Sequence, residues 1–111
     1  MRVIAYACAA MMVCSAAQSE EWRVLSGEQI ATQLTGRTVI YVNATQRFYA
    51  SGRTLYNAGH DSWGRWEVRG NQYCSQWPPA GGWACYDVAV QPGKLQFQGE
   101  SGDLSEGVFA K

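Results

Sequence analysis

The sequence predicts a mainly β protein: an antiparallel meander of seven or eight short strands forming a small barrel or a strongly twisted sheet, with one short N-terminal helix and one disulfide. Three observations predict it. Runs of β-branched and aromatic residues recur about every eight to twelve residues, separated by glycine, proline and asparagine. Strands do not alternate with helices, which disfavours a parallel α/β fold. Cys74 and Cys85 lie in neighbouring predicted strands.

The start of the chain has the pattern of a secretory signal peptide. An arginine near the start is followed by an uncharged apolar run, residues 3–13, and small residues at 15–17 fit the positions that a signal peptidase reads. The apolar run is about half as long as a membrane-spanning helix, so we expect no membrane span. Acylation of Cys14, as in a lipoprotein, is a less favoured alternative because Val13 stands where a small residue is expected. We therefore expect a signal peptide at residues 1–17 and a periplasmic or secreted protein.

After residue 17 the charges nearly balance, with eight Lys or Arg against nine Asp or Glu, and both signs are interspersed. A nucleic-acid partner would need a clustered basic run to neutralise phosphates, so we expect none. We expect residues 18–25 to be a polar lead-in segment and residues 26–111 to be a single β domain. A domain this small is marginally stable without further help.

Residues 27–34 are expected to form the helix. Ser26 is followed three residues later by glutamine, which is a capping-box pattern. Ile30 and Leu34 lie four residues apart on one face, and Gly36 fits the left-handed position that ends a helix. With only two apolar residues, this helix suits a lid across the end of a sheet.

The rest of the chain consists of predicted strands and turns. Gly52 and the pair Gly70-Asn71 indicate hairpins, and prolines and glycines mark the later turns. The predicted strands cover residues 37–43, 46–51, 53–57, 63–69, 72–77, 83–90, 94–98 and 107–110.

The two cysteines that remain after residue 17 are predicted to form a structural disulfide. With Cys74 directly opposite Cys85 on antiparallel strands, Tyr73 lies opposite Tyr86 and the turn falls at the Pro-Gly segment. Directly opposed Cα atoms can be ~4.5 Å apart, within the range of a disulfide. An exported protein meets an oxidising environment, and closing this loop contributes ~3 kcal/mol on the chain-entropy account.

Other uses of these cysteines fit less well. Zinc needs four ligands, whereas the chain offers two thiolates and a single histidine, His60, so we expect no metal and no cofactor. A thioredoxin-type redox site has two residues between its cysteines in a βαβ unit, and here ten residues intervene in a β context.

One part of the chain, "SWGRWEVRGNQYCSQWPP" followed by "WACYDV", carries a resemblance to known proteins. Its pattern Gly-x-Trp-x-Val, then Cys-x-x-Trp, then Cys-Tyr-x-Val resembles a family of uncharacterised small exported β domains from bacteria, mostly proteobacteria. The likeness is specific over residues 63–88. It implies an exported β domain and no assigned activity.

Five aromatic residues are candidate binding residues: Trp63, Tyr73, Trp77, Trp83 and Tyr86. Such residues commonly form the core of a small sheet, where aromatic cross-strand pairs are stabilising. Alternatively they form a binding face for sugar rings, an apolar ligand or another protein. Trp77 and Trp83 flank the Pro-Gly tip and are the best candidates for recognition.

We expect a non-catalytic binding or interaction module of the bacterial cell envelope. It would recognise an envelope protein or a glycan through the Trp77–Trp83 tip, and it could be inhibitor-like. The alternative is a lipocalin-like carrier of a small apolar ligand, although side chains would nearly fill so small a barrel. A hydrolase using His60 and Asp61 is the weakest alternative, because adjacent side chains on an extended segment point apart.

Overall fold

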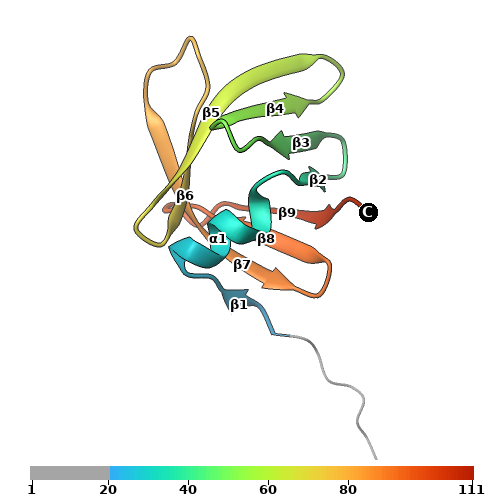
Figure 1. The fold of residues 1–111 in the computed structure, drawn as a ribbon, viewed down its shortest axis with the longest axis vertical. Helices are drawn as coiled ribbons and strands as arrows, with labels where there is room; N and C mark the ends of the chain where they lie inside the picture. Colours follow the sequence, from blue (N-terminus) through green and yellow to red (C-terminus); the bar gives the residue numbers. More distant parts are fainter. Residues whose placement is uncertain (1–20) are drawn as a thin grey trace, which may run out of the picture.

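The computed structural model describes residues 21–111, so the predicted signal peptide, residues 1–17, and the first part of the lead-in lie outside the described residues. The described chain folds into a closed antiparallel barrel of eight strands, with one extra strand and one helix (Figure 1). The elements are β1 Arg23–Val24, α1 Gly27–Leu34, β2 Thr38–Ile40, β3 Thr45–Phe48, β4 Arg53–Asn57, β5 Asp61–Arg69, β6 Gln72–Gln76, β7 Trp83–Gln91, β8 Lys94–Gln98 and β9 Leu104–Phe109.

The predicted meander is confirmed, and it is a closed barrel rather than an open twisted sheet. From β2 to β9 each strand pairs antiparallel with the next, and β2 closes the barrel on β9 through Val39 opposite Phe109 and Ile40 opposite Val108. The first predicted strand is shorter than expected because residues 41–44 form the turn into β3.

The strand β1, in the predicted lead-in segment, adds a ninth strand. Arg23 and Val24 pair with the second half of β7, beyond the place where β6 begins. The next residue explains why this segment is held: Leu25 is 3% exposed in the core, and its backbone N–H donates to the Val88 carbonyl at 2.8 Å.

Helix α1 has the predicted bounds and covers one end of the barrel. The Ser26 hydroxyl accepts a hydrogen bond from the Gln29 backbone N–H at 3.2 Å, and the Gln29 side chain accepts one from the Ser26 N–H at 2.9 Å. Ile30 and Leu34 are fully buried. Figure 1 shows α1 on the opposite side of the molecule from the two long projecting turns, β4–β5 and β6–β7.

A glycine allows α1 to lie directly against the β5–β6 turn. A Cβ atom added to Gly27 would lie 2.0 Å from the carbonyl oxygen of Gly70. At this contact the Gly27 N–H donates to the Asn71 side-chain oxygen at 2.8 Å. The first turn of the helix is therefore attached to the barrel by a hydrogen bond that any larger residue would displace.

Aromatic side chains fill the half of the barrel nearest α1. Phe48 is fully buried, and its ring lies 5.6 Å from Trp66, 5.7 Å from Tyr73 and 6.4 Å from Phe97, centroid to centroid. The complete buried cluster is Leu25, Ile30, Leu34, Val39, Phe48, Trp66, Tyr73, Val88, Val90, Leu95 and Phe97.

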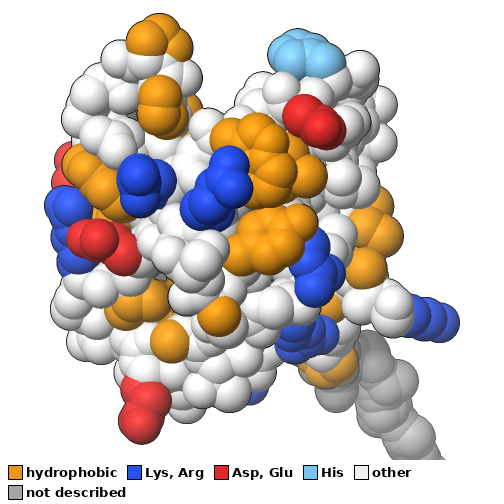
Figure 2. Space-filling view, turned by 45° about the horizontal axis from the view of Figure 1, so that its top comes forward, with side chains coloured by type: hydrophobic (Ala, Val, Ile, Leu, Met, Phe, Trp, Pro, Cys, Tyr) orange, Lys and Arg blue, Asp and Glu red, His pale blue; other side chains and the backbone are white. Residues whose placement is uncertain are grey.

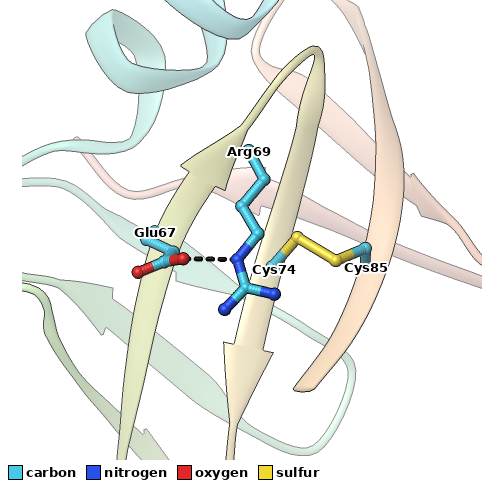
Figure 3. A network of polar contacts seen from close by, with 4 residues as sticks. All are labelled: Glu67, Arg69, Cys74 and Cys85. Carbon is cyan, nitrogen blue, oxygen red and sulfur yellow. Dashed lines mark hydrogen bonds and ion pairs between the residues drawn. A yellow bond between two sulfur atoms is a disulfide. The ribbon is translucent and has the colours of Figure 1, made fainter.

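The predicted disulfide is present. Cys74 and Cys85 are bonded with their Cα atoms 4.0 Å apart, and the predicted register of β6 against β7 is observed. The bridge lies on the outer face of these strands, and the ion pair between Arg69 and Glu67 on β5 lies beside it (Figure 3). The covalent link therefore joins two strands of the barrel wall and leaves the interior free.

Candidate functional site: a cup at the open end of the barrel

The end of the barrel opposite α1 is hollow. Residues from the β2–β3, β4–β5 and β6–β7 turns line a cup of about 930 Å³. Figure 2 shows the surface hollowed between the two projecting parts of the molecule. This volume lies within the usual range for small-molecule sites. The barrel is thus packed in one half and open in the other, which leaves more room than we expected for so small a barrel.

A network of hydrogen bonds forms the base of the cup. The Tyr41 hydroxyl donates to the side-chain oxygen of Gln46 at 2.8 Å. The Gln46 amide nitrogen donates to the Thr54 hydroxyl at 3.0 Å and to the Tyr73 hydroxyl at 3.2 Å. Gln46 is 5% exposed and Thr54 is fully buried. Because buried polar groups that bond to one another hold fixed positions, this base is ordered in advance of any ligand.

Trp77 forms one wall of the cup. Its indole N–H donates to the Ser75 hydroxyl at 3.2 Å, and its ring meets Tyr56 edge-to-face with centroids 6.0 Å apart. Gly64 of β5 lies behind the ring, where an added Cβ would come within 2.6 Å of the indole. The glycine therefore provides the space in which the half-buried Trp77 ring sits.

Tyr86 and Phe97 line the cup on strands β7 and β8. Their rings meet edge-to-face with centroids 6.3 Å apart, and Phe97 lies 4.8 Å from the Tyr73 ring. Aromatic rings thus come from both β6 and the two strands that follow it.

The lining of the cup is aromatic and mostly uncharged. None of its residues is Lys or Arg. The two carboxylates among the lining residues are hydrogen-bonded: Asp61 accepts from the Asn57 amide at 2.7 Å, and Glu106 accepts from the Gln96 amide at 2.8 Å. The interior combines ring faces with hydroxyl and amide groups, so it is suited to a neutral ligand that has both an apolar face and polar edges.

Burial changes the ionisation of the two tyrosines at the base. Desolvation, helped by the neighbouring hydroxyls of Tyr73 and Tyr56, raises the pKa of Tyr41 well above its ordinary value. Desolvation likewise raises the pKa of Tyr73 to about 12, against the opposing effect of its hydrogen bonds with Ser75 and Gln46. Both hydroxyls therefore stay neutral, and able to donate, at any physiological pH.

These shifts predict a loss of stability in alkali. The unfolded chain releases the Tyr73 proton near pH 10 and the folded chain near pH 12, so the folded state binds more protons in this interval and the free energy of unfolding falls as the pH rises. The shift of Tyr73 alone lowers the free energy of unfolding by roughly 3 kcal/mol between pH 10 and pH 12. Tyrosinate absorbance during alkaline titration tests it: in the folded protein, Tyr41 and Tyr73 should still be protonated at pH values where tyrosines of the unfolded chain have ionised. A folded protein in which every tyrosine ionises near pH 10 would contradict the buried network.

The structure brings four of the predicted binding residues to the cup, one of them at its rim, and separates the fifth. Tyr73, Trp77 and Tyr86 line the cup. Trp83 instead lies on the outer face, where the Arg69 guanidinium stacks on its ring at 4.5 Å. Trp63 borders the rim but is 41% exposed, with a guanidinium stacked on it from outside. Trp77 and Trp83 therefore belong to different surfaces and do not form one recognition tip.

His60 lies exposed in the β4–β5 turn at the rim of the cup. The neighbouring Asp61 carboxylate is engaged by the Asn57 amide. The hydrolase hypothesis gains no support from these contacts, and the expectation that the protein is not an enzyme stays a prediction. Within residues 21–111, no three His, Cys, Asp or Glu side chains gather in a way that could hold a metal ion.

Sequence reasoning missed four contributors to the cup: Tyr41, Gln46, Tyr56 and Ser75. A signal for two of them was available. Gln46 and Tyr56 each lie two residues from a fully buried strand residue, Phe48 and Thr54, and alternate residues of a strand share a face. A polar or aromatic residue that shares the inward face of a strand with a buried residue, and that lies close to a turn, therefore indicates the lining of a barrel's open end.

Comparison of this chain with protein-family models, with curated proteins and with solved structures gives no match. No helix in the described part of the chain has the length and apolar character that crossing a bilayer requires.

Proposed function

We propose that this chain is an exported, non-catalytic binding protein of the bacterial envelope, and that its cup binds one ring of an uncharged polyol, such as a sugar unit of a glycan. The leader pattern of residues 1–17 and the disulfide support export. One observation carries the binding proposal: the open half of the barrel is lined by fixed aromatic rings above a base of satisfied hydroxyl and amide groups.

The chemistry of the lining favours a sugar ring over a purely apolar ligand. A sugar presents C–H groups on its face and hydroxyls around its edge, so the face can cover Trp77 while the edge meets polar lining groups such as the side chains of Asn43 and Ser62. An apolar ligand would cover lining side chains such as Asn43 and Ser62, which have no side-chain hydrogen bond within the described residues, and a polar group that loses water without gaining a partner costs free energy. An anionic ligand would find no Lys or Arg in the cup.

The second candidate function is the lipocalin-like carrier, which the number of aromatic rings in the cup favours. The two candidates differ in their ligands. A carrier would bind an uncharged apolar dye such as Nile red and would ignore monosaccharides, whereas a sugar-binding cup would show the opposite preference.

Titration calorimetry with neutral monosaccharides and disaccharides tests the proposal. Trp77→Ala should weaken sugar binding at least about tenfold, or about 1.4 kcal/mol, because the ring that covers the sugar face is lost. Trp83→Ala is the matched control: the same residue type is removed from the same hairpin but on the outer face, and affinity should stay unchanged. Equal weakening by both variants, or dye binding with no sugar binding in the unmodified protein, would refute the proposal.

A further inference from the structure

A second surface of the barrel lies outside the cup, meets it only at Trp63 on the rim, and has the composition of an interaction site. The outer face of β3, β4 and β5 carries three exposed arginines interleaved with two aromatic rings. We call this set the arginine face, and its members are Arg47, Arg53, Arg65, Tyr49 and Trp63. Figure 2 shows hydrophobic and Lys or Arg side chains gathered next to one another on one side of the molecule.

The pairing of the strands places these residues on one face. Arg47 lies opposite Leu55, which in turn lies opposite Trp63. In the next row Arg53 lies directly opposite Arg65. Alternate residues of a strand share a face, so the two rows lie side by side on the outside of the barrel.

The arginines of this face have no acidic partner in the described residues. The only ion pair found in residues 21–111 joins Arg69 and Glu67. The other carboxylate on these strands, Asp61, is bound to the Asn57 amide. Like charges directly opposite one another on neighbouring strands are destabilising, so the Arg53–Arg65 pair weakens the isolated protein.

The aromatic rings hold two of the guanidinium groups in place. The Arg53 Cζ atom lies 4.0 Å from the centroid of the Trp63 ring, and the Arg47 Cζ atom lies 5.4 Å from that of Tyr49. The two rings lie 5.8 Å apart. The Arg47 guanidinium also donates to the Thr38 hydroxyl at 3.1 Å. A guanidinium stacked on a ring keeps its other N–H groups at the edge, and their planar arrangement matches a carboxylate.

We propose that the arginine face docks an acidic surface of a partner protein. Arginine, tryptophan and tyrosine are the residues that contribute most to protein–protein binding, and here stacking orients the charged groups in advance. Carboxylates of the partner would form ion pairs with Arg53 and Arg65, which have no acidic partner within the described residues. A polyanion such as a membrane surface or a nucleic acid is disfavoured, because the protein has almost no net charge and the barrel presents a convex face. This inference is independent of the ligand of the cup.

Fluorescence anisotropy with a short labelled peptide carrying glutamate at alternate positions tests the proposal, alongside the same peptide with glutamine. The glutamate peptide should bind and the glutamine peptide should not. Arg53→Ala or Arg65→Ala should weaken binding at least about tenfold. Arg23→Ala is the charge-matched control, because it removes an arginine that is also exposed, on β1, and it should leave the affinity within about twofold.

Arg65→Glu separates recognition from folding. It places a carboxylate directly opposite Arg53, so the melting temperature should rise while binding of the glutamate peptide disappears. Three results would overturn the proposal: absence of binding to the glutamate peptide, equal weakening by Arg23→Ala, or tighter binding to phosphatidylglycerol vesicles or single-stranded DNA than to the peptide through the same arginines.

Discussion

Replacing Phe48 with alanine will lower the free energy of unfolding by about 4 kcal/mol. Phe48 is fully buried at the centre of the packed half of the barrel, and it touches the rings of Trp66, Tyr73 and Phe97. Alanine leaves a cavity among these rings, and the barrel cannot collapse into it because strand pairing on both sides fixes β3. For a small domain this loss is a large part of the total stability.

Urea unfolding followed by tryptophan fluorescence measures the effect. Val42→Ala is the control, because Val42 is 94% exposed in the β2–β3 turn and its truncation should change the free energy of unfolding by less than about 0.5 kcal/mol. A loss of less than about 1 kcal/mol for Phe48→Ala would mean that the ring cluster is not the core.

Removing the disulfide by the double substitution Cys74→Ser/Cys85→Ser will lower the free energy of unfolding by about 3 kcal/mol. The bridge closes a loop with a sequence separation of 11 and thereby restricts the unfolded chain. It also joins β6 to the first half of β7, next to the long turn that forms one side of the cup.

The reductant dithiothreitol provides the control for this prediction. It should lower the stability of the unmodified protein by a similar amount and leave the double variant unchanged. Free thiols that titrate in the folded, oxidised protein would contradict the bridge. An unmodified protein whose unfolding curve is insensitive to the reductant, despite complete reduction, would contradict its contribution to stability.

Local signals account for what the sequence predicted well. The helix bounds follow from Ser26 and Gln29 at one end and Gly36 at the other, and each signal lies within two or three residues of the helix end that it marks. The register of β6 against β7 follows from a single constraint, the pairing of two cysteines. Barrel closure could not be derived in this way. It depends on β2 meeting β9, and no local signal connects residues so distant in the chain.

The candidate site was predicted in part. Tyr73, Trp77 and Tyr86 were identified as candidates and line the cup, but Trp77 was grouped with Trp83 because both flank the same tip. Alternation along the strands sends the two rings to opposite faces. The sequence could not show which face of β6 is the interior, because both faces carry buried residues. Tyr73 points inward and Cys74 points outward, yet both are buried.

The central claim is that the open half of the barrel is a preformed cup that binds a sugar ring against Trp77. The most direct measurement is a titration of the isotope-labelled protein with neutral sugars, observed through the tryptophan indole N–H signals in NMR spectra. The account predicts that the Trp77 signal moves with sugar concentration, while the signals of Trp83 and Trp66 stay in place. Movement of the Trp83 signal with a stationary Trp77 signal, or no movement of either with any sugar, would contradict it.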